Sequence, residues 1–134
     1  MKLKNLVPMM PVTDIHRSIA FYQDALGFTV HDKHTDEQGQ WLWCHLQSGN
    51  VELMLAFRRE GIDRAHQRQA RGAIVFYFYP DDVAALHAAL QQKRLAPGDL
   101  RVTFYGMKEF ELKDPDGHTL WFGQPTREPA THRE

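Results

Sequence analysis

The sequence predicts an α+β protein in which two β-α-β-β-β repeats form curled mixed sheets around a cleft. The first observation is the alternation of residue types from Gly106 to Gly123, which predicts a β-hairpin. The second is that the strand and helix order leading to this hairpin also occurs in the first half of the chain. The third is the composition of the 134 residues, 43% hydrophobic and 25% charged, which suits one globular domain.

The hairpin turns at residues 114–117, where Pro115 presets one φ angle and Gly117 supplies a positive one. Four apolar side chains share one face: Phe110, Leu112, Leu120 and Phe122. Four different side chains share the other face: Glu109, Glu111, Thr119 and Trp121. A solvent face rarely needs a tryptophan, and a core rarely takes two glutamates. We therefore interpret this second face as the wall of a cavity.

The first repeat spans about residues 3–57. Asp14 is a favourable N-cap and Gly27 a typical helix stop, with apolar residues at helical spacing between them. Four strands are predicted around this helix: Leu3–Val12, Phe28–His34, Trp41–Leu46 and Val51–Phe57. Alternation in the third strand places Trp41, Trp43 and His45 on one face. The other face holds Leu42, Cys44 and Leu46, and Cys44 is expected in the core.

The second repeat spans about residues 72–123 and follows the same order. Its predicted elements are a strand over Gly72–Tyr79, a helix opened by Pro80-Asp81-Asp82, a weak strand over Val102–Tyr105, and the hairpin. The helix has a buried stripe of Val83, Leu86 and Leu90. The faces under the two helices are predicted to hold Leu53, Leu55, Ile74, Phe76, Leu112 and Leu120. A basic connector over residues 58–71 joins the repeats within one domain of residues 1–134, and the tail, residues 124–134, is predicted to fray.

Charge and cysteine content narrow the classes of partner. The net charge of −1 implies no nucleic acid and no anionic membrane surface as a partner. A single cysteine, Cys44, excludes an intrachain disulfide and fits a reducing compartment. The sequence shows no signal peptide and no long apolar segment, so we expect a soluble cytoplasmic protein.

Two stretches are similar to a known superfamily. PVTDIHRSIAFYQDALGF resembles the opening, and GMKEFELKDPDGHTLWF the closing hairpin, of the vicinal-oxygen-chelate superfamily. That superfamily includes glyoxalase I, extradiol dioxygenases, fosfomycin-resistance enzymes and bleomycin-resistance proteins. The resemblance covers residues 5 to about 123 and implies the glyoxalase/bleomycin-resistance fold.

The metal enzymes of this superfamily carry four ligands, mostly His or Glu, on the cavity faces of the two sheets. Matched by motif, those positions hold Val7, Glu52, Ala73 and Trp121, of which only Glu52 can bind a metal. The resemblance therefore implies no metal and no other cofactor. It is closest to the bleomycin-resistance branch, whose members bind and sequester a drug without turnover, so we expect no catalytic residue.

Strand parity then selects the residues that line the cleft. They are Val7, Met9, Trp41, Trp43, His45, Glu52, Met54, Val75, Tyr77, Glu109, Glu111, Thr119 and Trp121. Aromatic faces stack on flat heterocycles and carboxylates attract cations, so the expected partner is a flat, cationic small molecule such as a glycopeptide antibiotic. Family members are dimers with clefts built partly from both chains, which implies a homodimer.

Several of these residues have plainer interpretations. Trp41 and Trp43 are alternatively dimer-interface anchors, and His45 is alternatively a hydrogen-bonded structural residue. Glu109 and Glu111 face water if the sheet is open there. His118, in the tight turn, is expected to be solvated.

Two other functions stay open from the sequence. One is a glyoxalase-like metal-dependent lyase or dioxygenase with rearranged ligands, using His45, Glu52 and Glu111. The other is a metal-free lyase or isomerase with Glu52 or His45 as general base, since clustered carboxylates raise one another's pKa.

Overall fold

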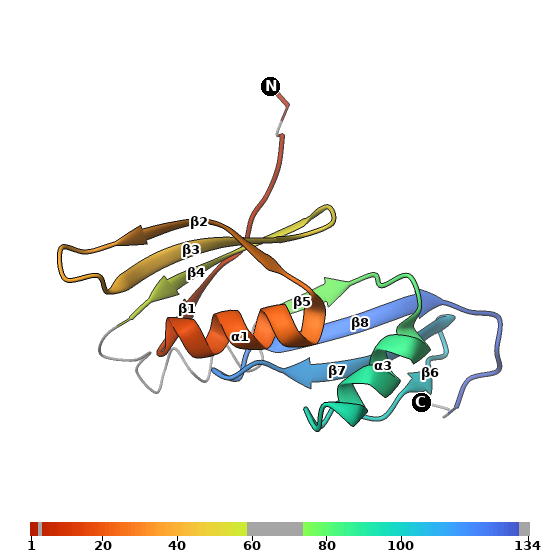
Figure 1. Cartoon of the computed structure of the whole chain (residues 1–134). Helices are drawn as coiled ribbons and strands as arrows, with labels where there is room; N and C mark the ends of the chain where they lie inside the picture. The colour runs from red at the N-terminus through yellow and green to blue at the C-terminus, as the bar shows by residue number, and fades with distance from the viewer. Residues whose placement is uncertain (3, 59–73, 132–134) are drawn as a thin grey trace. The chain divides into compact units, whose positions relative to one another are not determined.

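The computed structural model describes residues 1–2, 4–58 and 74–131 and divides into two compact units, Met1–His66 and Gln67–Glu134. The described part of each unit holds one four-stranded mixed sheet and one helix (Figure 1). The α+β class and the doubled strand–helix order predicted from the sequence are therefore confirmed.

The first unit has its helix on one face of its sheet (Figure 1). Its elements are β1 (Met9–Val12), α1 (Ile15–Leu26), β2 (Thr29–Thr35), β3 (Trp41–Ser48) and β4 (Val51–Phe57). The strand order is β1-β4-β3-β2, with β1 parallel to β4 and the other pairs antiparallel. The core contains Met10, Ile15, Ile19, Tyr22, Cys44, Leu46, Leu53 and Leu55. Cys44 is fully buried as expected, and burial raises the pKa of its thiol to about 11.

The second unit repeats this arrangement. Its elements are β5 (Val75–Phe78), α3 (Val83–Gln92), β6 (Arg101–Val102), β7 (Met107–Lys113) and β8 (Thr119–Pro125). The strand order is β5-β8-β7-β6, and β5 runs parallel to β8. Phe110, Leu112, Leu120 and Phe122 are buried, so the apolar hairpin face predicted from the sequence is confirmed.

The two helices begin in the same way. Asp14 and Asp82 are both extended N-caps, with φ and ψ of −140° and 98° in one and −141° and 96° in the other. The carboxylate of Asp14 accepts a hydrogen bond from the backbone N–H of Arg17, and that of Asp82 from Ala85, both at 3.1 Å. Each aspartate satisfies a helix donor that would otherwise lack a partner.

Three predicted strands are shorter in the structure. β1 starts at Met9 because Pro8 has no N–H for the ladder, although its carbonyl still accepts from the N–H of Met54. β5 starts at Val75, and Ile74, predicted to lie under the helix, is 62% exposed. β6 ends at Val102 because the chain turns at Gly106, whose φ is 84° and whose N–H bonds the Thr103 carbonyl.

Two histidines differ from expectation. His118 is buried, so the prediction that it is solvated is wrong; the tight turn folds its side chain inward, and its backbone N–H donates to the Asp114 carboxylate. His87 takes the buried place on α3 predicted for Leu86, which is half-buried. A hydrogen bond between His87 Nε2 and the Gly98 carbonyl, 2.7 Å long, makes that burial possible.

The parts that join and end the repeats are described only partly. Apart from Arg58, the predicted basic connector lies outside the described residues. Where the sequence predicts a frayed tail, β8 continues to Pro125, and Thr131 exchanges two hydrogen bonds with the backbone of Val102. Over the described ranges, none of the helices has the length and apolar character needed to cross a membrane.

Candidate functional site

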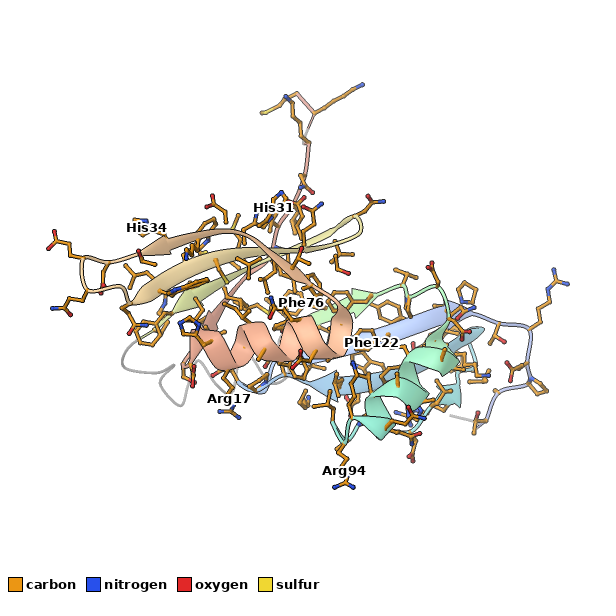
Figure 2. All side chains as sticks on the ribbon, in the orientation of Figure 1. Arg17, His31, His34, Phe76, Arg94 and Phe122 are labelled. Carbon is orange, nitrogen blue, oxygen red and sulfur yellow. The ribbon has the colours of Figure 1, made fainter. Side chains whose placement is uncertain are left out.

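The sheet face of the first unit that points away from α1 carries five of the predicted site residues. Residues directly opposite on neighbouring strands share a face, and the register pairs Met9 with Met54 and Met54 with His45. The shared face therefore holds Met9, Trp43, His45, Glu52 and Met54. His31 and His34 of β2 lie on the same side of the sheet in Figure 2.

Trp41 does not join this group. The β2–β3 register slips between His34 and Thr35, because Leu42 is an extra residue in β3 without a partner. Such a bulge reverses the alternation of side chains. Trp41 accordingly packs edge-on against His16 of α1 with 4.9 Å between ring centroids, and Lys33 Nζ lies 4.4 Å from its ring. Trp41 therefore lies on the α1 side of the sheet, opposite the face that strand parity predicts for it.

Val7 is the other predicted site residue of this unit that lies outside the regular face. It is half-buried and precedes β1, so strand alternation does not assign its direction.

A polar group occupies the centre of this face, and we call Asn5, His31, Trp43, His45 and Glu52 the histidine cluster. His45 Nε2 lies 2.8 Å from one Glu52 oxygen, and Asn5 Nδ2 donates to the other at 2.8 Å. The His45 ring stacks on Trp43 and meets His31 edge to face. Glu52 is thus held at both oxygens, and the imidazole is fixed in one orientation. Asn5 precedes the observed β1, but it alternates with Val7 and Met9 in the strand predicted over residues 3–12, so the same parity could have selected it.

In the second unit the face away from α3 also matches the predicted set. The register aligns Tyr77, Trp121 and Glu111 across three strands, and aligns Val75 with Thr119. Parity therefore places Val75, Tyr77, Glu109, Glu111, Thr119 and Trp121 on one face. Glu109 is only 4% exposed, so the alternative in which it faces water is wrong.

Two tyrosines make that burial possible, and we call Tyr77, Tyr105 and Glu109 the tyrosine clamp. Tyr77 Oη donates to Glu109 Oε2 at 2.8 Å, and Tyr105 Oη donates to Oε1. The Tyr77 phenol lies over the backbone of Gly123, where a Cβ atom would be 1.7 Å from its oxygen. Only glycine leaves room for this ring position. Tyr105 was not predicted as a site residue, because the sequence pattern places it at the end of a weak strand, whereas it stands in the turn after β6.

A pocket of about 180 Å³ opens beside the clamp. It is lined by residues 101–105, Glu109 and Trp121, so it combines aromatic walls with one buried carboxylate. Phe104 and Tyr105 are 72% and 56% exposed, which is unusual for large aromatic side chains that serve only packing.

The clamp changes the acidity of both phenols. Burial, followed by the hydrogen bond to Glu109, raises the pKa of Tyr77 far above its ordinary value. For Tyr105 the hydrogen bond to Glu109 is the first cause of a raised pKa, and burial is the second. Both phenols therefore stay protonated and continue to donate to the carboxylate.

We expect the free energy of unfolding to fall as pH rises above about 10, the pKa of tyrosine in an unfolded chain. Because the folded pKa is raised, the folded protein retains protons that the unfolded chain releases. The stabilisation is complete below that pH and is lost above it. Urea unfolding at pH 9 and pH 11 measures the slope, and Tyr77→Phe should flatten it. The titration of Cys44 contributes equally to the wild type and to Tyr77→Phe, so it does not affect the difference between their slopes. Equal slopes in the two proteins would contradict a raised Tyr77 pKa.

Within residues 1–2, 4–58 and 74–131, no three His, Cys, Asp or Glu side chains converge closely enough to hold a metal ion. Of the four positions implied by the resemblance, Ala73 lies outside the described residues.

Solved structures with the same fold include binding proteins and a glyoxalase family protein. TnmS3, an antibiotic binding protein from Streptomyces sp. CB03234, is 22% identical, with 94% of this chain and 99% of that chain covered and a TM-score of 0.71. A bleomycin-binding protein complexed with bleomycin is 21% identical, with coverages of 91% and 98% and a TM-score of 0.68. The glyoxalase family protein from Enterococcus faecalis is 22% identical, with coverages of 92% and 97% and a TM-score of 0.71.

At these identities the likeness concerns the fold alone, and no curated protein sequence matches significantly. The profile of one superfamily, in contrast, matches residues 6–122, which is most of the chain. That match agrees with the doubled strand–helix order and the two mixed sheets described above. The chain therefore belongs to the Glyoxalase/Bleomycin resistance protein/Dioxygenase superfamily.

Proposed function

We propose that this chain binds a flat, cationic small molecule and sequesters it without turnover, as a protein of the bleomycin-resistance type. The observation that carries the proposal is the chemistry of the tyrosine clamp. A buried carboxylate there borders an aromatic pocket, and among the described residues no ion pair joins Glu109 to a cation. A carboxylate in such a place favours a cationic ligand, and the rings beside it favour a flat one.

Two further observations support this ligand class. The histidine cluster presents a second hydrogen-bonded carboxylate, Glu52, next to the stacked ring of Trp43. Two structures of the same fold are an antibiotic binding protein and a bleomycin-binding protein complexed with bleomycin. A glycopeptide of the bleomycin kind, which is large, flat in part and cationic, is therefore the first ligand to test.

The proposed site is a cleft at the interface of a homodimer. Exposed apolar side chains on the edge strands support association, since Met9 of β1 and Val75 of β5 lie open to solvent. Sedimentation at micromolar concentration should show a dimer, and a monomer there would contradict the shared cleft.

The test is a titration of bleomycin followed by tryptophan fluorescence. We expect quenching whose affinity falls as salt rises, because salt screens the charge interaction and leaves stacking intact. Trp43→Ala should weaken binding about tenfold, since a desolvated stacking contact is worth about 1–2 kcal/mol. Trp41→Ala is the matched control, because it removes the same side chain from the same strand on the α1 side. Equal affinities in both variants would refute the assignment of this face.

The histidine cluster favours one second candidate, a metal-free lyase or isomerase. A histidine held by a carboxylate that is itself anchored by Asn5 resembles the base and orienting group of many enzymes. In that case His45 removes a proton from the bound molecule. Mass spectrometry of the ligand after incubation distinguishes the candidates, since sequestration returns it unchanged.

A further inference from the structure

The pocket at the tyrosine clamp has unused hydrogen-bonding capacity at its most buried point. Each carboxylate oxygen has two acceptor sites, and in Glu109 each oxygen receives one phenol. One acceptor site therefore remains on each oxygen. The two oxygens of one carboxylate lie in one plane, so a planar group with two N–H donors can meet both of them.

The volume limits what can enter. A cavity of about 150 Å³ is known to accommodate benzene. The pocket here measures about 180 Å³, so it has room for one six-membered ring with a small substituent. Trp121 and Phe104 line it and offer ring faces for stacking.

The charges around the pocket favour a cation at its inner end. Arg101 also lines the pocket and stands directly opposite Glu109 in the β6–β7 register. Its side chain is exposed, and no ion pair joins it to Glu109 among the described residues, so its charge acts through water and is screened by salt. Glu109 is buried, and both of its hydrogen-bond donors are neutral phenols. The carboxylate therefore dominates the inner end, and a planar cation there replaces lost hydration with charge-assisted hydrogen bonds.

We propose that this pocket is a ring-sized subsite for an aryl amidine or a similar planar cation, which it holds by paired hydrogen bonds to Glu109. The proposal deepens the proposed function and rests on it, because the subsite receives one cationic ring of the larger ligand. Tyr77 and Tyr105 are positioning residues: they hold the carboxylate plane toward the pocket.

The experiment compares three probes of nearly equal size in the wild-type protein by calorimetry and by NMR of backbone amides. Benzamidinium should bind about tenfold more tightly than neutral benzamide, because hydrogen bonds to a charged group are worth about 1.5–3 kcal/mol. Benzoate should bind most weakly. Resonances of residues 101–105 should shift on binding.

Variants then identify the group responsible. Glu109→Gln should abolish the preference for benzamidinium over benzamide, whereas Tyr105→Phe should reduce it and retain the carboxylate. Asp99→Asn removes the same charge from an exposed position in the same unit and should leave the preference unchanged. The wild-type comparison of probes stands even if Glu109→Gln folds poorly.

The subsite is overturned if benzamidinium and benzamide bind equally to the wild type, or if Glu109→Gln keeps the preference. If the wild-type protein still binds bleomycin in that case, the proposed function remains supported although the subsite does not. Conversely, a wild type that prefers benzamidinium through Glu109 but does not bind bleomycin supports the subsite and overturns the proposed ligand.

Discussion

Gly123→Ala is expected to lower the free energy of unfolding by about 2–4 kcal/mol, which combines overpacking with a lost hydrogen bond to a charged group. The added methyl would lie 1.7 Å from Tyr77 Oη and 2.5 Å from Cζ. The Tyr77 ring must therefore swing away and break its hydrogen bond to the buried Glu109 carboxylate. Urea unfolding of both proteins measures the difference.

A double-mutant cycle isolates the cause of that loss. In a Tyr77→Ala background the ring is absent, so adding Gly123→Ala should cost less than about 1 kcal/mol, because the three atoms nearest the added methyl all belong to Tyr77. An equal cost in both backgrounds would contradict the contact with Tyr77. The same Gly123→Ala protein should also show a reduced benzamidinium preference, as Tyr105→Phe does, because Glu109 loses one of its two phenols.

Asp114→Ala is expected to destabilise the protein by about 2–3 kcal/mol, the cost of leaving buried donors without partners. Asp114 is buried, and its Oδ1 accepts from the backbone N–H groups of Asp116 and His118, both at 2.9 Å. Alanine removes this acceptor while His118 stays buried.

Asp36 supplies a matched control for this variant. Its Oδ1 accepts from the backbone N–H groups of Gln38 and Gln40 at 2.8 and 2.9 Å, in a turn that also ends with a positive-φ glycine. This turn is more open to water, so Asp36→Ala should cost less than about 1 kcal/mol. Thermal and urea unfolding of the two variants test the contrast. If both variants lost the same free energy of unfolding, burial of the turn would not determine the cost of removing its aspartate.

The regular parts of the fold, and the sheet face on which most strand residues lie, could be predicted because strand alternation needs only local sequence. Tyr77, Glu111 and Trp121 align across three strands as parity requires. The sheet face of Trp41 was predicted wrongly, because a single residue of β3 without a partner in the β2–β3 register, Leu42, reverses the alternation. A bulge depends on pairing between strands, which the residues of one strand do not reveal.

The tyrosine clamp could not be predicted from local sequence either. Glu109 is buried because of Tyr105, which lies in a turn, and because of space left by Gly123 on the neighbouring strand. Each of these residues has an ordinary local interpretation by itself. The long-range arrangement gives the glutamate its neutral donors and the pocket its charged inner end.

Calorimetric titration of bleomycin into the wild-type protein, followed by mass spectrometry of the recovered ligand, tests the central claim most directly. We expect saturable binding that weakens as salt rises, with the ligand recovered chemically unchanged. The absence of binding to bleomycin and to other flat cations would contradict the proposed function. A chemically altered ligand would contradict sequestration and favour His45 as a base.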